Sequence, residues 1–146
     1  MDETGFLKVA DDLSREDTEA EWRSAISRAY YAAFHKARRL LQQNGFAVSH
    51  AEQAHAYLWK RLSNATHPDV MNAGRNLAHL RALRNGADYD FDSPIDQAEA
   101  QHLVGRATDI IQLLDDLAKE ATILARVVDA IKIYERDVLR EVTWQP

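Results

Sequence analysis

The stretch RAYYAAFHKARR, residues 28–39, contains two patterns at helical spacing. Side chains three, four or seven positions apart share one face of an α-helix. Apolar side chains gather on one such face, which predicts that this face is buried. The residues of this expected core face are Trp22, Ile26, Ala29, Tyr30, Ala33, Ala37, Leu40 and Leu41. The opposite face collects Ser24, Arg28, Tyr31, His35, Arg39 and Gln42. The stretch therefore predicts a long helix that buries one face and presents the other to water, to a ligand or to a partner subunit.

The rest of the chain predicts further helices. Only five glycines and three prolines interrupt it, and the period-two alternation of strands is hard to find. A Ser or Thr followed three residues later by Glu forms a capping box, which supports helix starts at Thr18 and Ser49. The expected helices cover residues 5–13, 18 to about 44, 49 to about 63 and 68 to about 88. An apolar stretch over 94–140 forms either one very long helix or two, and we favour two with a break near 119–122. We therefore expect one all-α domain over residues 1–146, an up-and-down bundle of four to five helices.

Composition and charge limit the partners of the chain. Its 146 residues are 46% hydrophobic and 28% charged, which is ordinary for a globular domain. The absence of cysteine excludes disulfides and thiolate metal sites, so the cytoplasm is the default location. No apolar run is long enough to span a bilayer, and we expect no membrane partner. Since the net charge is −5, any contact with RNA must use a local basic patch such as residues 23–39.

The segment LRNGADY, residues 83–89, places an arginine at the edge of an apolar stripe. Arg84 and Asp88 are four residues apart on the same helix, so they are expected to form an ion pair, with Arg81 at its flank. Such a pair has two interpretations. It can fix the end of the helix, or it can belong to a catalytic site, and ion pairs that only stabilise a fold are the commoner case.

The segments RAYYAAFH, residues 28–35, and LRNGADY, residues 83–89, together resemble the HEPN domain superfamily over residues 22 to about 117. The resemblance implies a HEPN-like helical bundle that usually forms a homodimer. Many members of that superfamily are metal-independent RNA endonucleases or toxins paired with a nucleotidyltransferase antitoxin. Others are non-catalytic. No cofactor and no metal site are expected, because the six histidines show no tight pattern of metal ligands.

The resemblance also implies candidate site residues. Nucleolytic members carry an arginine, a polar residue, a few further positions and then a histidine on a late helix, with two such motifs meeting across a dimer. Arg84 and Asn85 match the start of that motif, but Tyr89 stands where a histidine is expected. A tyrosine with its ordinary pKa near 10 is a poor general base at neutral pH. The expected catalytic residues are Arg84, Asn85, Tyr89 and His35, and the expected RNA-binding residues are Arg28, Tyr31, Arg39 and Arg81, with Asp88 as the structural partner of Arg84.

Two hypotheses of function follow. The first is an RNA-directed protein, a metal-independent endoribonuclease of a toxin–antitoxin or defence system, in which Arg28, Arg39, Arg81 and Arg84 form one positive cleft. The second is a non-catalytic interaction module that pairs with a nucleotidyltransferase or another protein. The missing late histidine favours the second hypothesis.

Overall fold

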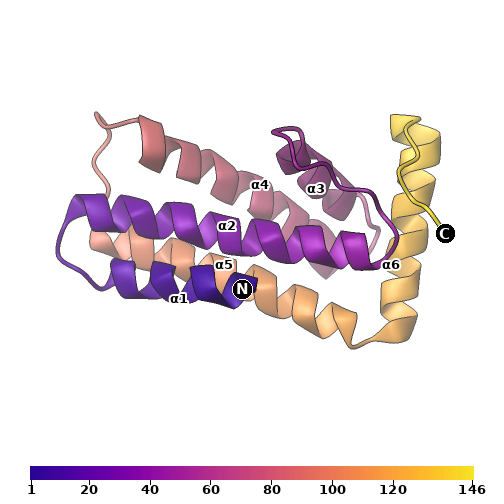
Figure 1. Ribbon diagram of the computed structural model, residues 1–146, viewed down its shortest axis with the longest axis horizontal. Helices are drawn as coiled ribbons and strands as arrows, with labels where there is room; N and C mark the ends of the chain where they lie inside the picture. The colour runs from indigo at the N-terminus through magenta and orange to yellow at the C-terminus, as the bar shows by residue number, and fades with distance from the viewer.

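The computed structural model describes residues 1–146 and is all-α, as expected (Figure 1). It contains six α-helices and a short π-helix: α1 Glu3–Ser14, α2 Glu19–Gln43, α3 Ala54–Ser63, α4 Pro68–Tyr89, α5 Gln97–Ala118, α6 Ala121–Tyr134 and η1 Glu135–Leu139. Helices α1, α2, α4 and α5 lie along the long axis of the molecule, and α6 runs across one end (Figure 1). The expected break in the apolar stretch is present between α5 and α6.

Helix α2 is the centre of the bundle, because it packs against α1, α4 and α5. Its predicted core face is buried except for Trp22, which is half-buried. Ala25, Ala32 and Phe34 are buried as well, although they lie off the predicted stripe. A helix with neighbours on several sides buries more than one face, and its small alanines let those neighbours approach closely. Helix α2 therefore exposes only the narrow polar stripe that contains Arg28 and Arg39.

Local capping explains the start of α2. The Thr18 hydroxyl oxygen accepts a hydrogen bond from the Glu21 backbone N–H at 3.3 Å and donates one to the Glu21 carboxylate at 2.6 Å. Substituting such a cap costs about 1 kcal/mol in typical helices. The predicted boundary at Thr18 is therefore confirmed.

The predicted capping box at Ser49 is wrong. Helix α3 begins at Ala54, and no side chain caps its first turn. The Ser49 hydroxyl accepts a hydrogen bond from the Ala51 N–H at 2.9 Å, which closes a local turn instead. Glu52 accepts a hydrogen bond from Arg81 of α4 at 2.7 Å. The carboxylate expected to cap a helix is therefore held by a cation from a distant part of the chain.

Arg23 joins α2 to the end of α4, a role that the sequence analysis missed. Its side chain is buried, and its guanidinium donates to the backbone oxygens of Ala87 at 2.9 Å, Asp90 at 2.9 Å and Ser93 at 2.6 Å. Carbonyls at the end of a helix lack intrahelical partners, so Arg23 satisfies groups that burial would otherwise penalise. Arg23 lies on the apolar stripe of α2 beside Ile26. A charged residue among these apolar positions is the sequence signal that could have indicated its role.

The C-terminal segment folds back onto the bundle. Arg140 adopts the left-handed conformation with φ 54°, and it reverses the chain after η1. The following residues reach the segment after α2, where Trp144 forms an isolated antiparallel bridge with Phe46. The Glu135 carboxylate is fully buried beneath this tail.

None of the helices combines the length and the apolar character that a bilayer crossing requires.

Candidate functional site

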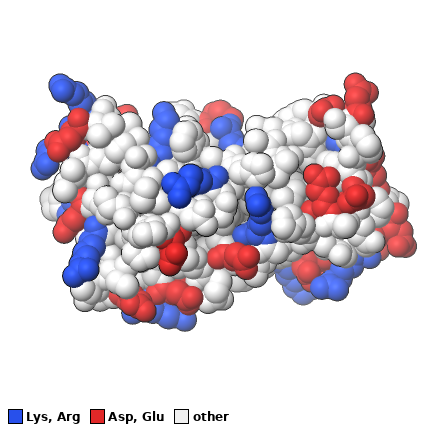
Figure 2. All heavy atoms as spheres, turned by 180° about the vertical axis from the view of Figure 1, so that it is seen from behind, with Lys and Arg blue, Asp and Glu red and all other residues white.

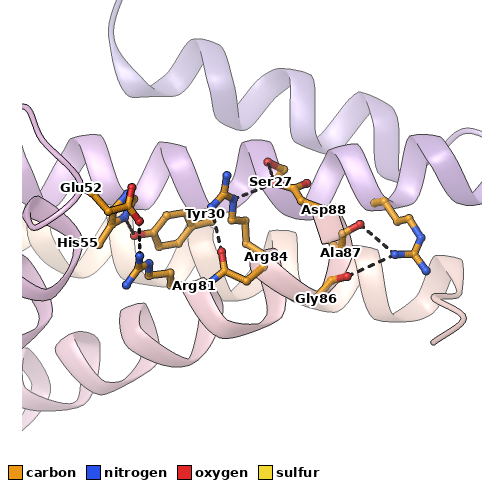
Figure 3. Close-up of polar contacts among 11 residues, drawn as sticks. Ser27, Tyr30, Glu52, His55, Arg81, Arg84, Gly86, Ala87 and Asp88 are labelled. Carbon is orange, nitrogen blue, oxygen red and sulfur yellow. Dashed lines mark hydrogen bonds and ion pairs between the residues drawn. The ribbon is translucent and has the colours of Figure 1, made fainter. Parts of the chain in front are cut away.

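A groove of about 340 Å³ lies between α2 and α4 and contains part of the predicted site. We call it the α2–α4 groove; it is lined by Ser24, Ser27, Arg28, Tyr31, Arg84 and Asp88. Figure 3 shows Arg84, Ser27 and Asp88 between the two helices. The expected polar face of α2 and the LRNGADY segment therefore meet in space.

The Arg84 guanidinium is held from several sides. Its Nε lies 2.9 Å from the Asp88 carboxylate, so the expected ion pair is present. One terminal nitrogen donates to the Asn85 side-chain oxygen at 2.9 Å, and the guanidinium carbon lies 5.0 Å from the centre of the Tyr31 ring. The Arg84 side chain is 14% exposed. A guanidinium fixed in this way is suited to bind an anion with its remaining N–H groups, because little side-chain freedom is left to lose.

Asp88 is held by both helices. Its carboxylate accepts a hydrogen bond from the Ser27 hydroxyl of α2 at 3.2 Å, in addition to its contact with Arg84. Arg23 fixes the carbonyls beside Asp88. The position of the ion pair therefore depends on α2 as well as on α4.

Arg28 supplies a cation to the groove that no carboxylate neutralises. The residue is exposed and forms no ion pair, and its guanidinium carbon lies 5.4 Å from the centre of the Phe6 ring of α1. A cation over an aromatic face keeps its charge available to solvent and ligands. Arg28 and Arg84 thus place one free and one partly neutralised guanidinium in the same groove.

Arg81 lies outside the groove and belongs to a second polar network. It pairs with Glu52, whose carboxylate lies 3.9 Å from the His55 ring (Figure 3). The other ring nitrogen of His55 lies 2.5 Å from the Tyr30 hydroxyl. Burial raises the pKa of Tyr30, and burial together with the charge of Arg81 lowers the pKa of His55. Both rings are therefore neutral at pH 7, and their contact links α2 to α3 inside the core.

His35 and Arg39 lie in a separate hollow beside the N-terminus. This hollow, which we call the His35 hollow, has a volume of about 250 Å³ and is lined by Met1, Asp2, Glu3, Phe6, His35, Arg38, Arg39 and Gln42. The His35 ring stacks on Phe6 with centroids 5.6 Å apart. Burial and the nearby charge of Arg38 lower the pKa of His35. Arg39 lies 3.1 Å from the Glu3 carboxylate.

The expectation of one positive cleft formed by four arginines is therefore wrong. Arg28 and Arg84 line the groove, Arg39 lines the His35 hollow, and Arg81 pairs with Glu52. For Arg39 the physical reason is distance along α2, since eleven residues separate it from Arg28 and correspond to about 16 Å of helix. Arg81, on α4, is instead held by the Glu52 carboxylate.

The remaining predicted residues lie at the edge of the site. Asn85 contacts Arg84 and is half-buried, whereas Tyr89 is 76% exposed and does not line the groove. None of the six residues that line the groove carries an imidazole. No group of three His, Cys, Asp or Glu side chains is arranged to hold a metal ion.

Comparison with known proteins gives one match. The model of the HEPN domain matches residues 5–117, which include the α2–α4 groove and both motifs of the sequence analysis. No curated protein matches, and no solved structure matches. The family match spans more than half of the chain and agrees with the all-α fold. The chain therefore belongs to the HEPN domain family.

Proposed function

We propose that this protein is RNA-directed and cleaves RNA without a metal ion, with the α2–α4 groove as the site that binds the scissile phosphate. The observation that carries the proposal is the placement of Arg84, held by Asp88, Asn85 and Tyr31, beside the unpaired Arg28. In such a reaction the ribose 2′-hydroxyl attacks the adjacent phosphorus and the bond to the 5′-oxygen breaks. Arg84 would stabilise the negative charge that develops on the phosphate oxygens.

His35 and Tyr89 are the proposed proton carriers, and the position of His35 favours a site made by two copies. Within one chain the Tyr89 ring lies 5.9 Å from the Arg84 guanidinium carbon, whereas His35 lines the His35 hollow and not the groove that contains Arg84. A second copy, packed against the exposed face of α2, would supply its His35 side chain from outside. A role in a toxin–antitoxin or defence system, in the cytoplasm where such RNA is found, is part of the same proposal.

Homodimer formation through the polar face of α2 can be measured directly. HEPN domains often dimerise, and exposed Arg and half-buried Tyr side chains are enriched at interfaces. We expect light scattering to give twice the mass of the chain at about 10 μM. At this concentration even a dimer with a dissociation constant in the micromolar range is present in a substantial fraction. A monomer at this concentration would remove the basis for a site composed of two copies.

The cleavage itself is tested by incubating the pure protein with total RNA in EDTA. We expect discrete fragments that end in 2′,3′-cyclic phosphates, and no cleavage of DNA, which lacks the 2′-hydroxyl. Cleavage only after addition of a divalent metal would contradict the metal-independent reaction. If the protein neither cleaves nor binds any RNA at low salt, the RNA-directed function is wrong.

A second candidate function is a non-catalytic interaction module. It is favoured by the absence of an imidazole from the groove lining and by the charge of Asp88, which partly neutralises Arg84. The partner would be a nucleotidyltransferase or another protein. Co-purification of a stable partner from cells, with no RNA cleavage by the complex, is the result expected for this function.

A further inference from the structure

A second groove runs between α4 and α5. It consists of two adjoining hollows, of about 220 Å³ and about 120 Å³, which share Asp69 and Leu113. We call it the α4–α5 groove; residues between His67 and Asn76 line one side, and residues between Asp109 and Ile123 line the other. No residue of α1, α2 or α3 lines it, so it is separate from the α2–α4 groove and from the His35 hollow.

The floor of the α4–α5 groove is apolar. Val70, Ile110 and Leu117 are buried there, and the side chains of Leu113 and Ile123 are half-buried. From residue 109 to residue 120 the groove follows α5 and its C-terminal end for about 16 Å, or about three turns of helix. A groove between two helices with an apolar floor of this length fits the apolar stripe of a third helix.

Carboxylates border this floor on both sides. Asp69 belongs to α4, Asp109 and Asp116 belong to α5, and Glu120 follows α5. All four are exposed, and none of them forms an ion pair. No lysine or arginine lines the groove. Figure 2 views the molecule from the side of α4 and α5, and Asp and Glu side chains lie along the lower middle of that side.

The charge of Asp116 is not explained by the stability of its own helix. Asp116 lies in the last turn of α5, which contains no basic residue. The C-terminal end of a helix carries a partial negative charge, so an aspartate there is unfavourable. The neighbouring Asp115 pairs with Lys36, whereas Asp116 accepts a hydrogen bond from the neutral Gln112 amide. A cation from outside the chain would offset this repulsion.

We infer that the α4–α5 groove docks a basic amphipathic helix of a protein partner. The apolar stripe of that helix would lie on Leu113 and Ile123, and its lysine or arginine side chains would reach the carboxylates of Asp69, Asp109 and Asp116. Charge complementarity selects this occupant, because unpaired carboxylates repel an acidic helix and repel nucleic acid. The groove shares no residue with the proposed RNA site, so docking does not depend on RNA cleavage.

The probe for this docking site is a fluorescently labelled synthetic peptide of about 14 residues, slightly longer than the groove when helical. It carries leucine at positions i, i+4, i+7 and i+11, lysine beside them, and alanine elsewhere to favour a helix. Fluorescence anisotropy measures its binding. We expect it to bind at least about tenfold more tightly than a peptide with glutamate in place of each lysine, and binding should weaken as the salt concentration rises.

Variants of the groove test where the peptide binds. Asp116→Asn should weaken binding by about threefold, and the double variant Asp109→Asn with Asp116→Asn by about tenfold, since exposed ion pairs contribute effects of this size. Asp116→Asn should also unfold at a slightly higher temperature, because it removes an unfavourable charge from the end of α5. Weaker binding by this variant is then not a result of unfolding. Asp129→Asn is the matched control, because Asp129 is exposed on α6, outside the groove, and should bind the peptide like the wild type.

Three results would overturn the docking site. The first is equal binding of the lysine and glutamate peptides, or no binding of either. The second is an equal loss of binding for Asp129→Asn and Asp116→Asn, which would show that only the net charge of the protein matters. The third is conversion of a dimer into a monomer by Asp116→Asn in light scattering, which would make the groove an interface between copies of this chain.

Discussion

Replacing Arg84 by alanine is expected to lower metal-independent RNA cleavage by at least about 100-fold, the usual effect of removing a group that stabilises transition-state charge. Arg84 is the guanidinium that the groove holds most firmly, through Asp88, Asn85 and the Tyr31 ring. Arg84→Lys should recover little of the activity, since an ammonium group cannot reproduce the planar fork of donors. The measurement is the rate of cleavage of a defined RNA in EDTA.

The fold should survive the Arg84→Ala substitution. Asp88 is 25% exposed and keeps its hydrogen bond from Ser27, so its charge remains partly solvated and hydrogen-bonded after Arg84 is removed. We expect a loss of stability of about 1 kcal/mol and an unchanged oligomeric state. Arg75→Ala removes the same charge from an exposed position of the same helix and should cleave RNA like the wild type. Equal rates for wild type and Arg84→Ala would show that the groove is not the catalytic site.

The largest effect on stability is expected for Glu135→Ala, at about 3–5 kcal/mol. Glu135 is fully buried and lies 2.7 Å from the Arg61 guanidinium, whose side chain is 3% exposed. The same carboxylate accepts hydrogen bonds from the backbone N–H groups of Thr143 and Trp144. Its removal leaves a buried cation without a counter-ion and releases the C-terminal tail. Urea unfolding followed by circular dichroism measures the loss, and Glu141→Ala, an exposed carboxylate of the same tail, should change it little.

The same buried pair predicts a pH dependence. Burial disfavours the charge of Glu135, but hydrogen bonds from Thr143 and Arg61 outweigh it and hold the pKa below its ordinary value of 4.5. The unfolded chain therefore binds a proton that the folded chain does not, so this contribution to stability is complete above pH 4.5 and is lost as the pH falls through the folded pKa. We expect Glu135→Gln to lose less stability than the wild type on acidification. If the free energy of unfolding of the two proteins depended on pH in the same way, the predicted contribution of the Glu135–Arg61 pair would be contradicted.

Local sequence signals determined the helices. The start of α2 at Thr18 and the proline at the start of α4 both depend on residues within one turn of the helix end. The Arg84–Asp88 pair belongs to the same class, because both residues share one helix face. The two HEPN-like motifs could be recognised from the sequence for the same reason, because each is one short continuous segment. Ser49 shows the limit of such signals, because the carboxylate that should have completed its capping box is bound to Arg81 of another helix.

Only the tertiary structure decided which side chains share a site. Arg23 reaches the carbonyl of Ala87 across 64 residues of sequence, and Arg61 reaches Glu135 across 74. The packing of α1 against α2 likewise separates Arg39 and His35 from the groove that holds Arg84. Helical periodicity states which way a side chain points around its own axis, but it contains no information on which other helix lies in that direction. The faces of α2 could therefore be predicted from the sequence, whereas the division of its basic face into a groove and a hollow required the positions of α1 and α4.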